Sequence, residues 1–219
     1  MIYLIPGLGA DAKVFKNLQL KGESYVIMDW IKPIKKESLA NYAQRLAETY
    51  FIPNEEINLV GLSMGGMIAK EIYKSFKVNK CIIISSIQIS SQFSTSIKLA
   101  RLTPLHKIIP IGSLRKLNHL TANYFFSVKD DISRRALHKT IDETDPEFLT
   151  WAIGAILEWK CTQFEPKIIH IHGDRDRIFP IKNIDTPVHL INKGGHWMIV
   201  ERGKEISELL LKIIYNKID

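Results

Sequence analysis

Short apolar runs alternate along the chain with stretches whose apolar residues recur at helical spacing. The runs are nearly continuous Ile, Val and Leu, a composition typical of strands that are buried on both faces of a sheet. Six such runs predict strands at residues 2–5, 25–28, 57–60, 81–84, 168–171 and 188–191. Because strands and helices alternate, the pattern predicts an α/β fold: a three-layer α/β/α sandwich with a mostly parallel sheet of about six strands.

The stretches between the runs predict helices. Residues 38–50 place four apolar side chains on one helical face, and Ser38 stands at the N-cap position. Further helices are expected at residues 12–18, 64–76 and 204–214. Asp11 would cap the first of these, since its carboxylate can accept from the free N–H groups of the opening turn.

Residues 87–162 break this alternation, because they hold helical patches but no strand-like run. Their clearest helix begins at Asp145-Pro146-Glu147, where an N-cap aspartate precedes a proline and an acid in the first turn. So long a stretch is improbable as a bare loop. We therefore expect one domain over residues 1–219, with a helical lid inserted at residues 87–162.

The composition of the 219 residues, 46% apolar and 24% charged, is typical of a soluble globular protein and excludes intrinsic disorder. No apolar run approaches the roughly 20 residues of a membrane-spanning helix. No signal-peptide pattern precedes the first predicted strand. Two cysteines, Cys81 and Cys161, do not make a disulfide framework. These features predict a cytoplasmic protein that does not bind membranes.

The chain is basic, with 30 Lys+Arg against 23 Asp+Glu and a formal net charge of +7. A nucleic-acid interface would need these charges clustered on one element, whereas they are spread along the whole sequence. The surplus therefore indicates surface lysines and no nucleic-acid partner. No spacing of Cys and His typical of zinc occurs, and the glycine-rich loop after the first strand lacks the phosphate-binding patterns, so we expect neither metal nor cofactor.

The sharpest local signal is Gly61-Leu62-Ser63-Met64-Gly65-Gly66, which lies between a predicted strand and a predicted helix. In this G-x-S-x-G pattern the chain turns abruptly and leaves the serine hydroxyl exposed at the tip. Side chains two residues to either side would collide in so tight a turn, which is why glycine stands at 61 and 65. The pattern predicts a nucleophile at Ser63, the alternative being a glycine-rich turn without chemistry.

A serine nucleophile needs a base within hydrogen-bond reach. Six of the seven histidines lie in the insertion or in and beside predicted strands, where surface or core roles are expected: His106, His119, His138, His170, His172 and His189. His196 differs, because it follows the last predicted strand after Asn192-Lys193-Gly194-Gly195. It also lies downstream of every candidate acid, as the chain order serine, acid, histidine requires. We expect His196 to be the base.

The acid that orients this base is expected just after the strand at 168–171. The chain there reads His172-Gly173-Asp174-Arg175-Asp176, and both aspartates are candidates. Asp174 lies nearer the glycine and is suited to closing the turn through its own backbone. No carboxylate follows the preceding strand, where the sequence is Ser85-Ser86-Ile87.

Acyl transfer also needs N–H donors directed at the developing oxyanion. The Met64 N–H lies directly after the candidate nucleophile, at the start of a helix. The second donor would come from the loop after the first strand, with the Leu8 N–H as the first choice.

Taken together, these motifs resemble those of small serine hydrolases of the α/β-hydrolase fold. The similarity covers residues 2–214 apart from most of the insertion, and it rests on the following runs: Pro6-Gly7-Leu8-Gly9, Gly61 to Gly66, Gly173 to Pro180, and Gly194-Gly195-His196-Trp197-Met198. In that family the acid usually lies three residues after the glycine, which corresponds to Asp176. The resemblance also implies an oxyanion hole of two N–H groups and a lid between the sixth and seventh of eight strands.

Two departures from the family pattern stand out. The two antiparallel strands that usually open the fold are absent, so the resemblance implies a fold without its first two strands. Pro6-Gly7 stands where the family usually has His-Gly.

The resemblance implies hydrolysis of carboxylic esters or thioesters of small molecules through an acyl-enzyme. Acyl transfer, C–C bond hydrolysis, lyase chemistry and a non-catalytic small-molecule receptor are the alternatives on this scaffold. Five aromatic residues of the insertion would line an acyl pocket or pack in the core: Phe93, Tyr124, Phe125, Phe126 and Trp151.

Overall fold

Six parallel strands form a single sheet in the order β2-β1-β3-β4-β5-β6. The computed structural model describes residues 1–102, 115–128 and 130–217. The strands are β1 (Ile2–Ile5), β2 (Tyr25–Ile27), β3 (Asn58–Leu62), β4 (Lys80–Ile84), β5 (Ile169–Gly173) and β6 (His189–Ile191). Each predicted strand is present, with small shifts at the ends, and the predicted α/β sandwich is confirmed.

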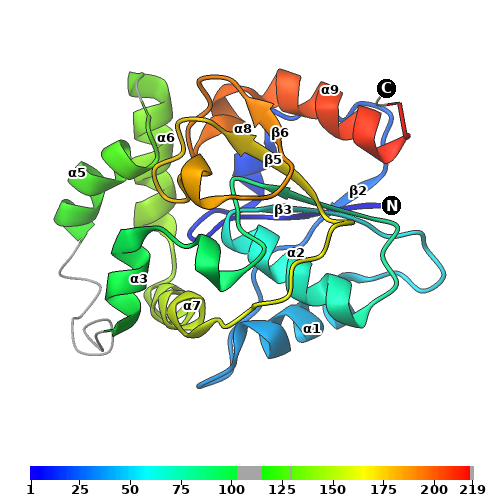
Figure 1. The fold of residues 1–219 in the computed structure, drawn as a ribbon, viewed down its shortest axis with the longest axis horizontal. Helices are drawn as coiled ribbons and strands as arrows, with labels where there is room; N and C mark the ends of the chain where they lie inside the picture. The colour runs from blue at the N-terminus through cyan, green and yellow to red at the C-terminus, as the bar shows by residue number, and fades with distance from the viewer. Residues whose placement is uncertain (103–114, 129, 218–219) are drawn as a thin grey trace.

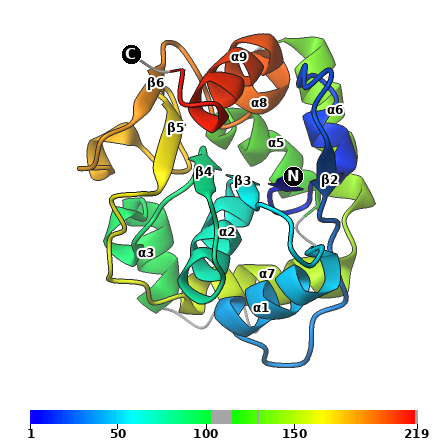
Figure 2. The same ribbon diagram turned by 90° about the vertical axis from the view of Figure 1, so that its right-hand side faces the viewer.

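Helices cover both faces of this sheet (Figure 2). One face carries α1 (Leu39–Tyr50) and α2 (Met64–Ser75), and the other carries α8 (Met198–Glu201) and α9 (Gly203–Ile214). Between β4 and β5 the described residues form η2 (Ser90–Gln92), α3 (Thr95–Leu102), α5 (Arg115–Phe125), α6 (Asp131–Glu143) and α7 (Pro146–Glu158) (Figure 1). A short η4 (Ile181–Asn183) precedes β6.

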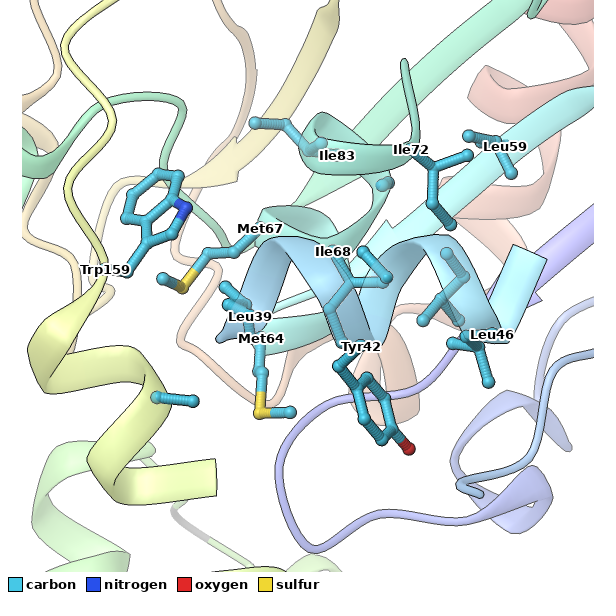
Figure 3. Packing of buried hydrophobic residues seen from close by; sticks show 14 of the residues in the cluster. Leu39, Tyr42, Leu46, Leu59, Met64, Met67, Ile68, Ile72, Ile83 and Trp159 are labelled. Carbon is cyan, nitrogen blue, oxygen red and sulfur yellow. The ribbon is translucent and has the colours of Figure 1, made fainter. Parts of the chain in front are cut away.

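The strands divide the core into two clusters, because successive side chains of a strand point to opposite faces. Tyr3 and Leu59 face α1 and α2, whereas Leu4 and Val60 face α8 and α9. On the first face, α1 and α2 contribute interleaved apolar side chains (Figure 3): Leu39, Tyr42, Leu46, Met64, Ile68 and Ile72. This packing fixes the start of α2, where the elbow lies.

The predicted helix ends are partly confirmed. Ser38 Oγ accepts from Asn41 N at 3.2 Å, and Asp145 Oδ1 accepts from Phe148 N at 2.7 Å, as expected of N-caps. Asp11 likewise caps η1 (Ala12–Phe15).

The helix predicted at residues 12–18 was too long, because η1 is a 3₁₀ turn that ends at Phe15. Contacts with α8 and α9 compete with the local preference here. The Gln19 N–H donates to Ser207 Oγ of α9 at 2.7 Å, and the Asn17 side chain donates to Val200 O of α8 at 2.6 Å.

No helix within the described ranges is both long enough and apolar enough to cross a bilayer.

Candidate active site

Ser63 lies at the junction of β3 and α2, in a backbone conformation that side chains rarely adopt. Its φ is 53° and its ψ is −118°. A Cβ on Gly61 would lie 2.3 Å from Gly65 O, and a Cβ on Gly65 would lie 2.3 Å from both Ile5 O and Pro6 O. Both positions therefore require glycine, because a side chain would collide with backbone atoms. At Gly65 these atoms belong to the end of β1, so the elbow packs directly on that strand.

Gly65→Ala is expected to destabilise the fold by ~3 kcal/mol or more, because the new methyl group meets backbone atoms that cannot move aside. Gly154→Ala in α7 is the matched control, since a Cβ there meets nothing within 4 Å. It should raise the free energy of unfolding by ~0.5–1 kcal/mol, as Gly to Ala does inside a helix. Urea unfolding followed by circular dichroism measures both changes. Equal stability of Gly65→Ala and the wild type would contradict this account of the elbow.

The structure brings Ser63, His196 and Asp176 into one hydrogen-bonded chain. His196 Nε2 lies 2.9 Å from Ser63 Oγ, and His196 Nδ1 lies 2.7 Å from Asp176 Oδ2. Because the carboxylate accepts the proton of Nδ1, the lone pair of neutral His196 is at Nε2 and faces the serine hydroxyl. His196 and Asp176 are 3% and 4% exposed, so the hydrogen bond between them is almost completely shielded from water.

Asp176, not Asp174, contacts the histidine. Asp176 Oδ1 accepts from the N–H groups of Ile178 and Phe179, both at 2.9 Å, which leaves Oδ2 for His196. The expectation that Asp174 closes this turn was wrong, because Asp176 does so. Asp174 Oδ1 is buried and has no hydrogen-bond partner among the described residues.

The two expected oxyanion donors belong to segments that adjoin Ser63. The Met64 N–H belongs to the first turn of α2, where backbone N–H groups have no partner within the helix. Leu8 follows Gly7, which sits so close to the elbow that a Cβ there would lie 3.3 Å from Ser63 Cβ.

Two side chains from distant parts of the sequence contact the loop that carries Leu8. Thr144 Oγ1, at the turn between α6 and α7, lies 3.0 Å from Gly9 O and 2.8 Å from Thr140 O, so its single proton is shared between these two carbonyl acceptors. The Trp30 indole N–H donates to Ala10 O at 2.8 Å. The sequence did not indicate either contact, because neither residue belongs to a motif.

The C-terminal end of α5 packs on the loops that carry Asp176 and His196. The Phe126 ring lies edge-on to the His196 imidazole, with centroids 5.1 Å apart. Ser127 Oγ donates to Arg175 O at 2.9 Å, and the Arg177 guanidinium stacks 4.2 Å from the centroid of the Tyr124 ring. One end of the insertion is thereby joined to the candidate site.

The five aromatic residues of the insertion take different positions. Phe93 is fully buried in the core, and Tyr124 is 59% exposed. Trp151 lines a cleft of about 1310 Å³ between residues 30–37 and α7, but Ser63 and His196 do not line this cleft. In the part of the chain that the structure describes, these five side chains therefore do not line a common acyl pocket at Ser63.

Behind the acid loop, two neutral histidines are buried in β5. The expectation of a core role for His170 and His172 is confirmed, since they are 1% and 0% exposed. Burial lowers the pKa of His170 to about 3 and also lowers the pKa of His172, because a charged imidazole is unfavourable in this environment.

Acidification is expected to destabilise the fold through His170. Its folded pKa of about 3 lies below the ~6.5 of an unfolded histidine. Between these values the unfolded state binds the extra proton, so stability is fully present above pH ~6.5. The free energy of unfolding then falls by up to ~1.4 kcal/mol per pH unit as the pH decreases. Urea melts at pH 7, 6 and 5 measure this slope, which His170→Gln should reduce. An unchanged slope in that variant would contradict the assignment.

Across the part of the chain that the structure describes, no group of three His, Cys, Asp or Glu side chains is placed to hold a metal ion.

Comparisons with known proteins identify the fold. No family model and no curated protein matches the sequence, whereas many solved structures match the whole fold. A thermophilic esterase from Thermogutta terrifontis shares 15% identity at a TM-score of 0.77, with 98% of this chain and 89% of that chain covered. An esterase from Exiguobacterium antarcticum shares 15% at 0.73, covering 98% and 91%. A bromoperoxidase from Bacillus anthracis shares 18% at 0.70, also covering 98% and 91%.

Proposed function

We propose that this chain, which has the α/β-hydrolase fold, is a serine hydrolase of carboxylic esters or thioesters of small molecules. The observation that carries the proposal is the hydrogen-bonded chain from Ser63 through His196 to Asp176, with the serine at a strained elbow. A serine hydroxyl, an imidazole and a carboxylate lie in the order and at the distances that acyl transfer by a serine nucleophile needs.

In the proposed reaction, Ser63 Oγ attacks the carbonyl carbon of the substrate while His196 Nε2 takes its proton. Asp176 stabilises the imidazolium and holds its Nδ1–H, at 2.7 Å. The N–H groups of Leu8 and Met64 would stabilise the tetrahedral oxyanion. His196 then gives the proton to the departing alcohol or thiol as the bond to it breaks, which leaves an acyl group on Ser63 Oγ. Water attacks this acyl carbon while His196 Nε2 takes its proton, and His196 returns the proton to Ser63 Oγ as the acid departs. The proposed reaction uses these side chains, two backbone N–H groups and water, and it includes neither metal nor cofactor.

The insertion and the location in the cell complete the proposal. The helices between β4 and β5 would act as a lid, which is supported by the contacts of Tyr124, Phe126 and Ser127 with the candidate site.

A cytoplasmic location is supported by Cys81 and Cys161, which are both free thiols and buried.

The solved structures of similar fold favour ester chemistry, since two of those named above are described as esterases. The bromoperoxidase shows that the same fold also hosts other chemistry. The non-catalytic receptor is less well supported, because binding alone does not need an aligned serine, imidazole and carboxylate.

Two measurements on the wild-type protein test the proposal. A fluorophosphonate probe should label Ser63, located by mass spectrometry of the modified peptide. A series of p-nitrophenyl esters of increasing acyl length should be hydrolysed, with the preferred length reporting the size of the acyl site. If the probe does not label the protein and no ester of the series is hydrolysed, the proposal is overturned. Tight binding of a small molecule without labelling would favour the receptor instead.

A further inference from the structure

Two buried histidines lie behind the acid loop and take no part in the proposed reaction. His170 Nε2 lies 3.0 Å from His172 Nδ1, and the two rings are nearly perpendicular, at 84°. His172 Nε2 lies 2.8 Å from Phe179 O. The second contact connects this pair to the loop that carries Asp176.

The partners of these rings determine where their protons are. Phe179 O can only accept, so His172 Nε2 carries a hydrogen and donates it. Burial lowers the pKa of His172, so the ring is neutral near pH 7 and its Nδ1 has a lone pair. That lone pair accepts from the Nε2–H of His170. The tautomer and the orientation of His172 are thereby fixed from both sides.

Phe179 joins His172 to both Asp176 and His196. Its N–H donates to Asp176 Oδ1 at 2.9 Å, and its C=O accepts from His172 at 2.8 Å. Its ring packs edge-on against the His196 imidazole, with centroids 5.6 Å apart. A shift of Phe179 would therefore move the acid and the base together.

His172 holds this loop without competing for the acid. His172 Nε2 lies 3.7 Å from Asp176 Oδ2, which is too long for a hydrogen bond, whereas His196 Nδ1 lies 2.7 Å from the same oxygen. Because the His172 ring is neutral, it also places no full charge beside the carboxylate. Asp176 Oδ2 is left for His196.

We propose that His172 is a positioning residue: through its hydrogen bond to Phe179 it keeps Asp176 and His196 aligned with Ser63. The inference rests on the proposed function for its effect on turnover, but its effect on the Asp176–His196 hydrogen bond does not depend on any substrate.

The test compares amide side chains of different length at position 172. In His172→Gln the amide nitrogen can occupy the place of Nε2 and donate to Phe179 O, whereas the shorter side chain of His172→Asn cannot reach it. His172→Phe keeps a ring and removes the donor. Ile171→Val is the matched control, because Ile171 is equally buried in β5 but belongs to the core cluster on the opposite face of the sheet.

Two readouts separate positioning from packing. The first is the split between kcat and KM on a p-nitrophenyl ester at pH 8. The second is the proton NMR signal of the His196 Nδ1–H, which a short hydrogen bond moves to low field and which His196→Gln identifies by its loss.

We expect His172→Asn and His172→Phe to lower kcat by ~10-fold or more with KM within about 2-fold, as when an interaction made in the transition state is lost. The low-field signal should shift or broaden in both. His172→Gln should restore both readouts. Ile171→Val should lower the thermal midpoint and leave kcat and the signal unchanged.

Wild-type kcat and an unchanged signal in folded His172→Asn or His172→Phe would overturn the inference. So would a His172→Gln variant as impaired as His172→Asn, or failure of all three His172 variants to fold, which would assign His172 to the core. If the wild type hydrolyses no ester but the signal responds as expected, the positioning role holds and the proposed function fails.

Discussion

Ser63→Ala is expected to lower kcat for ester hydrolysis by ~10⁶-fold and to abolish fluorophosphonate labelling. The hydroxyl is the nucleophile that forms the acyl-enzyme in the proposed reaction, and without it the acyl group has no oxygen to which it can be transferred. The fold should be retained, because among the described hydrogen bonds the hydroxyl makes only the one to His196 Nε2. Initial rates with a p-nitrophenyl ester, gel-based labelling and thermal unfolding measure the three quantities.

Ser90→Ala is a suitable control for this variant. Ser90 Oγ donates to Cys161 O at 3.0 Å, outside the candidate site, so its loss should cost about 1 kcal/mol of stability and no activity. Ester hydrolysis by Ser63→Ala at the wild-type rate would exclude Ser63 as the nucleophile.

Asp176→Asn is expected to lower kcat by ~10⁴-fold while the loop stays in place. The Asn oxygen can still accept from the N–H groups of Ile178 and Phe179, which fixes the side chain. Its NH₂ group then faces His196 Nδ1 and favours the tautomer whose Nε2 carries the proton. In that tautomer Nε2 cannot take the serine proton. Steady-state kinetics and the low-field proton signal both report the change.

Asp174→Asn provides the matched control, two residues away on the same loop. Asp174 does not contact His196 in the described hydrogen bonds, so this variant should keep kcat within ~3-fold of the wild type. A loss in Asp174→Asn as large as in Asp176→Asn would show that the orienting carboxylate has been misassigned.

The sequence was sufficient for the features that depend on local pattern. Strands buried on both faces have a distinctive composition, so all six could be located. Ser63 could be singled out because glycines at 61 and 65, between a predicted strand and a predicted helix, are typical of a nucleophile elbow. His196 could be chosen from seven histidines because it follows every candidate acid and lies on a loop after the last predicted strand. These features depend on the local sequence pattern and on the order of the motifs along the chain.

Other features could not be predicted from local pattern. The residues of the acid loop leave Asp174 and Asp176 as alternatives, and only the family resemblance favours Asp176, because the residue types do not show which carboxylate accepts from the N–H groups of Ile178 and Phe179. The helix expected at 12–18 ends early because Asn17 and Gln19 hydrogen-bond to α8 and α9 instead. Thr144 is 135 positions from Gly9 in the sequence, so no local signal could reveal their contact.

That last contact limits how freely the insertion can be exchanged. The Thr144 hydroxyl, at the turn between α6 and α7, lies within hydrogen-bond distance of Gly9 O on the loop that carries the Leu8 N–H, so the insertion contacts part of the candidate site. A chimaera that grafts another insertion between β4 and β5 to change substrate preference would remove this contact. In such engineering, Thr144 and its contact with Gly9 should be kept when the rest of the insertion is replaced.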